Sequence, residues 1–165
     1  MKILMWPNLT LNYVSCKVTQ PLDSELASEM ERLMLDAGGV GLSAIQVGVP
    51  LTFFITKIDR KSPTKVYVNP IIQGFFGTPT PMLEGCLSLP GQFELIRRFP
   101  EIKISYWNSD LTKLTEETIN GLEAHCCQHE VEHGRGELFV DKLPSAKRST
   151  IRGNLQKMKR NGSIK

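Results

Sequence analysis

The amino-acid sequence predicts an α+β fold, in which antiparallel strands pack around a central helix bearing the string HEVEH and a further helix follows at the C-terminus. One observation predicts this class, and a second predicts the number of domains. Strand-like patterns are grouped between helical patterns and do not alternate regularly with them, which argues against a doubly wound parallel sheet. The chain also contains no internal repeat, low-complexity tract or linker. One compact domain is therefore expected.

Three segments have the spacing of helices that bury one side. The first is expected over residues 24–37, where Asp23 can cap its start and Gly38 can end it. The second runs from about residue 122 through 133, because no proline interrupts this stretch. The third is expected over residues 145–160. Its apolar side consists of Ile151, Leu155 and Met158.

Four segments have the composition or alternation of strands. Residues 51–58 and 65–73 are rich in β-branched and aromatic side chains and flank a turn-rich segment. Pro70 predicts an edge or a bulge in the second of them. Residues 101–107 alternate with period two, and residues 113–119 return after a polar turn. The last two segments are therefore expected to form a hairpin.

The composition indicates one domain over residues 1–165, with a flexible end at residues 161–165. The chain has 165 residues, of which 41% are hydrophobic, enough for one core and short for two. No stretch of about 18 apolar residues occurs, which predicts no membrane span. An early proline interrupts the N-terminus where an export signal would need an apolar run. A cytoplasmic protein is therefore expected.

The four cysteines fit a reducing compartment better than they fit two disulfides. Cys126 and Cys127 are adjacent inside the predicted second helix, and Cys86 lies in a loop-like segment. Cys16 is expected to be a small, buried apolar residue.

The net charge of +3 is distributed unevenly along the chain. No acidic residue follows Asp141, so the C-terminal segment is strongly cationic. A solvated helix face would account for part of this charge, and an anionic partner such as RNA accounts better for its one-sidedness. The basic residues concerned are Lys142, Lys147, Arg148, Arg152, Lys157, Lys159, Arg160 and Lys165.

The string HEVEH, residues 129–133, is the most informative motif in the chain. Two imidazoles four residues apart on a helix point the same way and can bind one metal ion. Glu130 would lie beside that ion, where a metal-dependent hydrolase needs a base. The alternative is a pair of ordinary surface histidines. Because Gly134 follows at once, we expect the motif to end its helix.

His129 and His133 need a further ligand, since a catalytic metal usually takes three protein ligands. His125 also lies four residues from His129, but three successive turns climb about 12 Å and cannot share one ion. Cys86, in the segment EGCLSLP, offers a thiolate, which is a strong ligand for iron or zinc. The alternative for Cys86 is a core cysteine in a buried strand. The presence of HEVEH favours the ligand.

The segment GVGLSAIQ, residues 39–46, is expected to connect the first helix to the first strand. Its glycines let backbone groups approach a ligand, and Gln46 can donate to a developing oxyanion. In EGCLSLP, Gly85 permits a similar approach and the Leu87 amide can point into a site. Each segment alone is also compatible with an ordinary connection.

Taken together and in this order, the segments resemble those of the peptide deformylases, which remove the N-formyl group from new bacterial-type polypeptides. The resemblance covers nearly the whole chain. It includes ILMWP at residues 3–7, GVGLSAIQ, EGCLSLP, QHEVEH, ELFVD at residues 137–141 and the basic C-terminal segment. It implies a single catalytic domain that releases formate from N-terminal formyl-methionine of nascent polypeptides.

The resemblance also implies a role for each matching residue. The implied metal ligands are Cys86, His129 and His133. The expected ion is Fe(II), and Zn(II) or Ni(II) can occupy such a site. Glu130 is implied to be the general acid/base, while Gln46 and the Leu87 amide hold the formyl oxygen. The implied substrate contacts are Val40, Gly41, Glu84, Gly85, Leu122 and His125.

The chain departs from the family's habit at several helix positions. His125 and Glu123 stand where bacterial members often have apolar residues near the pocket for methionine, so an altered side-chain preference is expected. Glu132 replaces the usual aspartate, and Arg98 is expected to pair with it and brace the helix. The resemblance further implies a monomer whose residues 145–160 dock on ribosomal RNA near the exit tunnel.

Two other functions compete with a deformylase. A metallopeptidase of the HEVEH type usually finds its third ligand farther along the chain, where only Glu137 and Asp141 are near. A catalytically dead ribosome-binding protein would not need the intact set of ligands and base. Both alternatives fit the sequence less well than the deformylase.

Overall fold

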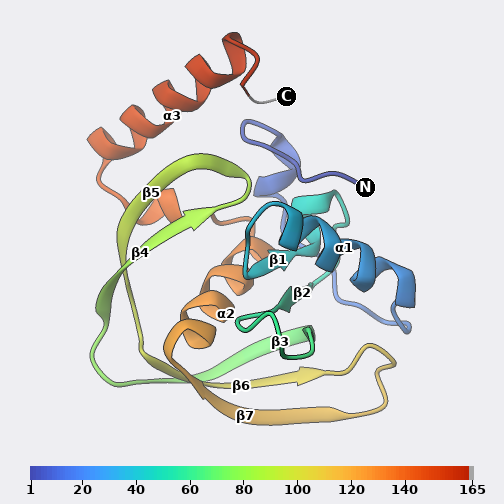
Figure 1. Ribbon diagram of the computed structural model, residues 1–165. Helices are drawn as coiled ribbons and strands as arrows, with labels where there is room; N and C mark the ends of the chain where they lie inside the picture. The colour runs from blue at the N-terminus through green and yellow to red at the C-terminus, as the bar shows by residue number, and fades with distance from the viewer. Residues whose placement is uncertain (164–165) are drawn as a thin grey trace.

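The structure is a computed structural model that describes residues 1–163, and it has the predicted α+β architecture (Figure 1). Residues 164 and 165, part of the expected flexible end, lie outside the described residues. The elements in chain order are the 3-10 helix η1 Leu9–Asn12, α1 Ser24–Asp36, β1 Gly41–Ser43, the 3-10 helix η2 Ala44–Val47, β2 Phe53–Thr56, β3 Lys65–Phe76, β4 Thr80–Cys86, β5 Leu89–Arg98, β6 Glu101–Trp107, β7 Leu114–Asn120, α2 Gly121–Gly134, the 3-10 helix η3 Phe139–Lys142 and α3 Ser145–Arg160.

The strands form two antiparallel sheets. The larger has the order β1-β2-β3-β6-β7, and the smaller is the β4–β5 hairpin. Figure 1 shows α2, in orange, between the hairpin and the larger sheet, while α3 lies on the outer side of the hairpin. Both sheets can therefore present residues to the same helix.

Three clusters of buried side chains hold these layers together. One joins α1 to β1 and β2, through Met30 and Met34, among others. A second joins α2 to the larger sheet, with Cys127 packed near Tyr67. The third joins α3 and η3 to β5, and Leu155 is fully buried in it. The α3 helix is thus anchored to the domain through one apolar side.

The predicted helices are confirmed to within a residue or two. Asp23 caps α1, since its side chain accepts a hydrogen bond from the Glu25 N–H at 2.9 Å. HEVEH forms the end of α2, as expected. In α3, Ile151 and Leu155 are buried and Met158 packs beside the same cluster, which confirms the predicted apolar side.

The predicted strands are also present, and β3 shows which of the two expected positions, an edge or a bulge, Pro70 occupies. The strand is internal to the sheet, and its register with β6 shifts between Val68 and Ile71, so Pro70 occupies a bulge. Asn69, beside it, has a φ of 49°, and its side chain exchanges hydrogen bonds of 2.8 Å with the backbone of Val18. The bulge is therefore hydrogen-bonded to the N-terminal segment.

The β4–β5 hairpin was not predicted. Two prolines and two glycines interrupt residues 80–98, so the strand pattern is hidden in the sequence, although the structure pairs seven positions from Thr80 with Arg98 to Cys86 with Leu89. Cys86 is accordingly the last residue of a strand and does not lie in a loop. This hairpin supplies one side of the site described below.

The expectation for Cys16 was wrong. Cys16 is exposed, and its backbone forms an isolated β-bridge with Leu51. All four cysteines are free thiols. Among the described residues, none of the helices combines the length and the apolar character that a membrane span requires.

Candidate metal centre and active site

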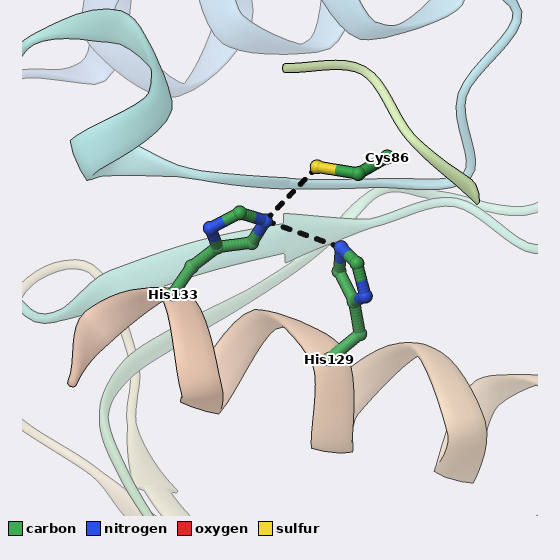
Figure 2. A group of neighbouring side chains, drawn as sticks. All are labelled: Cys86, His129 and His133. Carbon is green, nitrogen blue, oxygen red and sulfur yellow. Dashed lines mark hydrogen bonds between the residues drawn. The ribbon is translucent and has the colours of Figure 1, made fainter. Parts of the chain in front are cut away.

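Cys86, His129 and His133 converge on one point between α2 and the end of β4. The two histidines lie one helical turn apart on the side of α2 that faces the hairpin, and Figure 2 shows both rings turned toward the Cys86 thiol. The His133 Nε2 atom lies 3.2 Å from the Cys86 Sγ atom and 3.1 Å from the His129 Nε2 atom. The three ligand atoms all lie within 4.8 Å of one another.

These three side chains fit a metal ion in spacing and in chemistry. Atoms bound tetrahedrally to one ion at about 2.0–2.3 Å are separated by about 3.3–3.6 Å, close to the 3.2 and 3.1 Å that separate His133 Nε2 from the other two ligand atoms. One thiolate and two imidazoles suit iron, zinc or nickel better than magnesium or calcium. His125, one turn before His129, is not part of this group, as the length of three helical turns predicted.

Glu84 orients the first histidine. Its Oε1 atom accepts a hydrogen bond of 2.6 Å from the His129 Nδ1 atom, which leaves Nε2 free to bind an ion. Burial would raise the pKa of Glu84, but hydrogen bonds from Arg98 and His129 outweigh it and lower the pKa to about 2. The carboxylate therefore remains charged across the physiological range.

Arg98 joins Glu84 on β4 to Glu132 on α2. Its Nη2 atom donates to Glu84 at 2.7 Å and to Glu132 at 3.0 Å, and its Nη1 atom donates to Glu132 at 2.9 Å. The guanidinium is 2% exposed, and the two carboxylates are 13% and 12% exposed. The predicted pairing of Arg98 with Glu132 is confirmed, and the link to Glu84 is an addition that the sequence did not indicate.

The two histidines differ in their electrostatic surroundings. Burial, together with the neighbouring charge of His129, lowers the pKa of His133, so its ring is held in the neutral form that binds metals. Burial also opposes charge on His129, but its contacts with the Cys86 and Glu84 side chains outweigh that effect and raise the pKa of His129. A proton on His129 Nδ1 is thereby stabilised.

Glu130, next to His129 on α2, lines a cavity beside these ligands and is only 4% exposed. Burial raises its pKa to about 7, against the opposing influence of the His129 charge. Among residues 1–163, no atom forms a hydrogen bond with its Oε2 atom. A Cβ atom at Gly41 would come within 2.6 Å of its Oε1 atom, so the glycine leaves room for this carboxyl group.

Gln46 contacts Cys86, and Leu87 follows Cys86 in the chain. The Gln46 Oε1 atom accepts from the Ser43 N–H at 2.9 Å, and its Nε2 atom donates to Ser88 at 3.1 Å and to the Cys86 Sγ atom at 3.5 Å. The amide nitrogen is thus directed at the candidate metal centre. Leu87 lies in the turn of the β4–β5 hairpin, because Cys86 pairs with Leu89, so its N–H is outside the strand ladder.

A cavity of about 500 Å³ opens beside the metal centre. All six residues predicted to contact substrate line it, namely Val40, Gly41, Glu84, Gly85, Leu122 and His125. The carboxylate of Glu84 is already occupied by Arg98 and His129. Glu123 does not line the cavity and instead bonds Tyr67 at 2.8 Å on the side of the larger sheet.

Sequence patterns missed several other residues of the cavity wall. The missed residues include Ile3, Met5, Met82 and Phe93. The first two belong to the N-terminal segment ILMWP, whose backbone reaches the site through the Leu4 N–H bonded to the Gln46 carbonyl at 2.7 Å. The other two come from the unpredicted hairpin, so recognition of that hairpin would have been the way to find them.

Comparison with known proteins gives one consistent result. The family described as polypeptide deformylase matches residues 1–149. A peptide deformylase of Hahella chejuensis is 38% identical over 161 residues, covering 95% of each chain. One of Pelagibacter ubique is 38% identical over 167 residues, covering 98% of this chain and 96% of its own.

Solved structures agree with the sequence relatives. A peptide deformylase of Legionella pneumophila superposes with a TM-score of 0.88 at 37% identity, covering 99% of this chain and 98% of its own. A peptide deformylase of Ehrlichia chaffeensis in complex with actinonin gives a TM-score of 0.90 at 27% identity, with 97% and 98% covered. The similarity extends over the whole fold.

We predict that Arg98→Met lowers the free energy of unfolding by about 3–5 kcal/mol, because it leaves two largely buried carboxylates without their shared cation. Urea unfolding monitored by circular dichroism measures the change. Arg97→Met is the matched control, since Arg97 is exposed on the other side of the same strand and should change stability by about 0.5 kcal/mol or less. Equal stability of the two variants would contradict a central role for Arg98.

Proposed function

The chain belongs to the polypeptide deformylase family, and on that premise we propose how its own residues carry out the family's reaction. It is a metal-dependent hydrolase that removes the formyl group from the N-terminal formyl-methionine of newly made polypeptides and releases formate. The roles of the individual residues, the identity of the ion and the cellular partners form the proposal.

Cys86, His129 and His133 hold the ion. Their mutual distances of 3.1 and 3.2 Å support this assignment, as does the hydrogen bond from His129 to Glu84, which fixes the ring. The ion is iron(II) in this proposal, and zinc or nickel can take its place. When bound, it supplies a Lewis acid that lowers the pKa of water and polarises a carbonyl group.

Glu130 moves the proton of the reaction. A carboxyl group with a pKa of about 7 can take a proton from the attacking water and later return it. As the water oxygen bonds to the formyl carbon, the Glu130 carboxylate receives the water proton. When the bond between that carbon and the peptide nitrogen breaks, Glu130 delivers the proton to the leaving amine. Formate and a free N-terminus result.

Gln46 and the Leu87 amide stabilise the charge that develops on the formyl oxygen. Both donors lie next to Cys86, and Gln46 is held in one orientation by Ser43 and Ser88. Fixed donors cost no reorganisation when charge develops, so their contribution is realised in the transition state.

One observation carries the functional proposal. A buried glutamate, whose Oε2 atom has no hydrogen-bond partner among the described residues, lies beside three converged candidate metal ligands in a cavity. The competing metallopeptidase lacks such support. Asp141 is occupied as an acceptor for the Leu138 N–H at 2.9 Å, and Glu137 is exposed. Neither belongs to the ligand group found among the described residues.

We predict that Glu130→Gln lowers kcat for formyl-Met-Ala-Ser by a factor of about 100 or more, because an amide cannot accept the water proton. Formate release under anaerobic conditions is the measurement. Glu137→Gln, which removes an exposed glutamate close to the same helix, is the control and should keep full activity. Formate from neither the wild type nor the control would refute the function, and equal rates for Glu130→Gln and wild type would refute the role of Glu130.

A second prediction concerns the ion itself. Anaerobically purified wild-type protein should contain about one equivalent of iron, and His133→Ala should lose nearly all of it, since two remaining ligands bind a divalent ion weakly. His125→Ala should keep the metal, because this ring lies outside the ligand group. Elemental analysis of the purified proteins measures the content. Loss of metal from the His125→Ala variant would instead identify His125 as a metal ligand.

We further propose that the protein acts as a cytoplasmic monomer and that α3 binds ribosomal RNA near the exit tunnel, where nascent chains emerge. Ile151 and Leu155 bury one side of α3, which leaves its basic side chains outward. Within residues 1–163, Lys147 pairs with Glu94, whereas the five other basic residues of α3 form no ion pair. Unpaired cations on a fixed helix suit a phosphate backbone.

We predict that replacing Arg152, Lys159 and Arg160 together by glutamate weakens co-sedimentation with ribosomes at low salt by about tenfold or more. These side chains are exposed, so the domain should remain folded, which deletion of α3 with its buried Leu155 would not ensure. The control has an identical change of charge at the exposed Lys17, Lys61 and Lys113. Equal loss of binding in both triple variants would leave α3 without a specific role.

A further inference from the structure

His125 is the polar residue of the cavity wall whose chemistry the proposed reaction leaves unused. It lies on α2 one turn before His129, lines the cavity and is 5% exposed. Its Nδ1 atom is buried without a hydrogen-bond partner, and among residues 1–163 no hydrogen bond reaches Nε2 either. The Nδ1 atom is closed off from the cavity, so Nε2 is the ring atom that a bound molecule can reach. A hydrogen-bonding group at a largely buried position is costly until a partner satisfies it, so the ring indicates a ligand that bonds Nε2.

Apart from Glu130, which the proposed reaction uses for proton transfer, the other polar side chains around the cavity are already engaged. Glu84 accepts from Arg98 and His129, and Gln46 bonds Ser43, Ser88 and Cys86. Burial raises the pKa of the Cys126 thiol well above its usual value, so this group stays protonated and is only a weak donor. His125 is therefore the strong hydrogen-bonding side chain that remains available to a bound molecule.

The position of His125 determines which part of a substrate it can meet. Four residues along a helix correspond to a rise of about 6 Å, so the His125 ring lies about that far along α2 from His129. The formyl carbon must lie at the metal centre beside Glu130. A side chain that leaves the adjoining residue and follows α2 over Leu122 and Cys126 would bring its last atoms to His125.

We propose that His125 is a specificity-determining residue, whose ring hydrogen-bonds an acceptor atom near the end of the substrate's first side chain. The pocket then selects a side chain with a sulfur or oxygen acceptor over a hydrocarbon of the same length. This inference rests on the proposed function, because it assumes that the formylated residue occupies the cavity.

The chemistry of the ring supports this selection. Burial and the charge of Arg98 lower the pKa of His125, so the imidazole is neutral and offers one N–H donor and one acceptor. A thioether sulfur is a weak acceptor, and a sulfoxide oxygen is a strong one. Norleucine has the shape of methionine and no acceptor, so it leaves the ring unsatisfied. Methionine sulfoxide should be tolerated here better than an apolar pocket would allow.

The test compares three formyl peptides that differ only in the first side chain: methionine, norleucine and methionine sulfoxide, each followed by Ala-Ser. The variants are wild type, His125→Leu, which removes the polar atoms, and His125→Asn, which restores a donor. Ratios of kcat/KM between peptides on one preparation are compared, so a partly unfolded variant does not distort the result.

In His125→Leu we expect the preference for methionine over norleucine to fall about threefold and that for the sulfoxide over norleucine to fall about tenfold or more. The change should lie in KM, since a side-chain contact is present in the ground state and the transition state alike. His125→Asn should recover part of both preferences. Leu122→Ala, which alters the same cavity without changing its polarity, should lower kcat/KM for all three peptides by similar factors.

Unchanged ratios in an active His125→Leu enzyme would overturn the inference while leaving the deformylase function intact. Equal shifts in His125→Leu and Leu122→Ala would also overturn it, because cavity shape and not polarity would then set the preference. Failure of the wild type to release formate from any of the three peptides would refute the proposed function, and the inference with it.

Discussion

The site depends on a guanidinium that is removed from water between two carboxylates. Arg98 is the last residue of β5, and its charge is compensated by Glu84 on β4 and by Glu132 on α2. Separation of the hairpin from the helix would therefore break these ion pairs and leave buried charges without a partner. Glu84 in turn fixes the ring of His129. The same interaction that joins the hairpin to the helix therefore orients a candidate metal ligand, and the stability of this contact and the geometry of the candidate metal centre are coupled.

Packing of α2 between the two sheets explains the electrostatics of the site. The side of the helix that carries the histidines and Glu130 is covered by the hairpin and by the segment around Gly41, which excludes most water from these groups. Desolvation then raises the pKa of Glu130 to about 7, while Glu84, with two donors, stays ionised. Two carboxyl groups that line one cavity thus acquire different pKa values, because Glu84 has two strong donors and Glu130 lies buried without comparable ones.

How much the sequence predicted varied from element to element. The helices were predictable because capping, apolar spacing and stop residues are local, and α2 with HEVEH ends where Gly134 suggested. The choice of Cys86 over His125 as the third ligand also followed from helix geometry, and the three side chains converge in the structure. The β4–β5 hairpin was missed because its prolines and glycines hide the strand pattern, and Cys16 was misjudged because residue type alone does not set exposure.

By itself the sequence determined the candidate reacting groups, because helical spacing and residue chemistry suffice to align two histidines with a glutamate and to offer a thiolate as their partner. Only the tertiary structure decided how these groups are held and what surrounds them. The contacts of Glu84 with Arg98 and His129, the turn of Glu123 toward the larger sheet and the unpaired ring of His125 depend on how β4, β5 and α2 pack together. Such contacts join residues far apart in the chain, and no local pattern encodes which of them will meet.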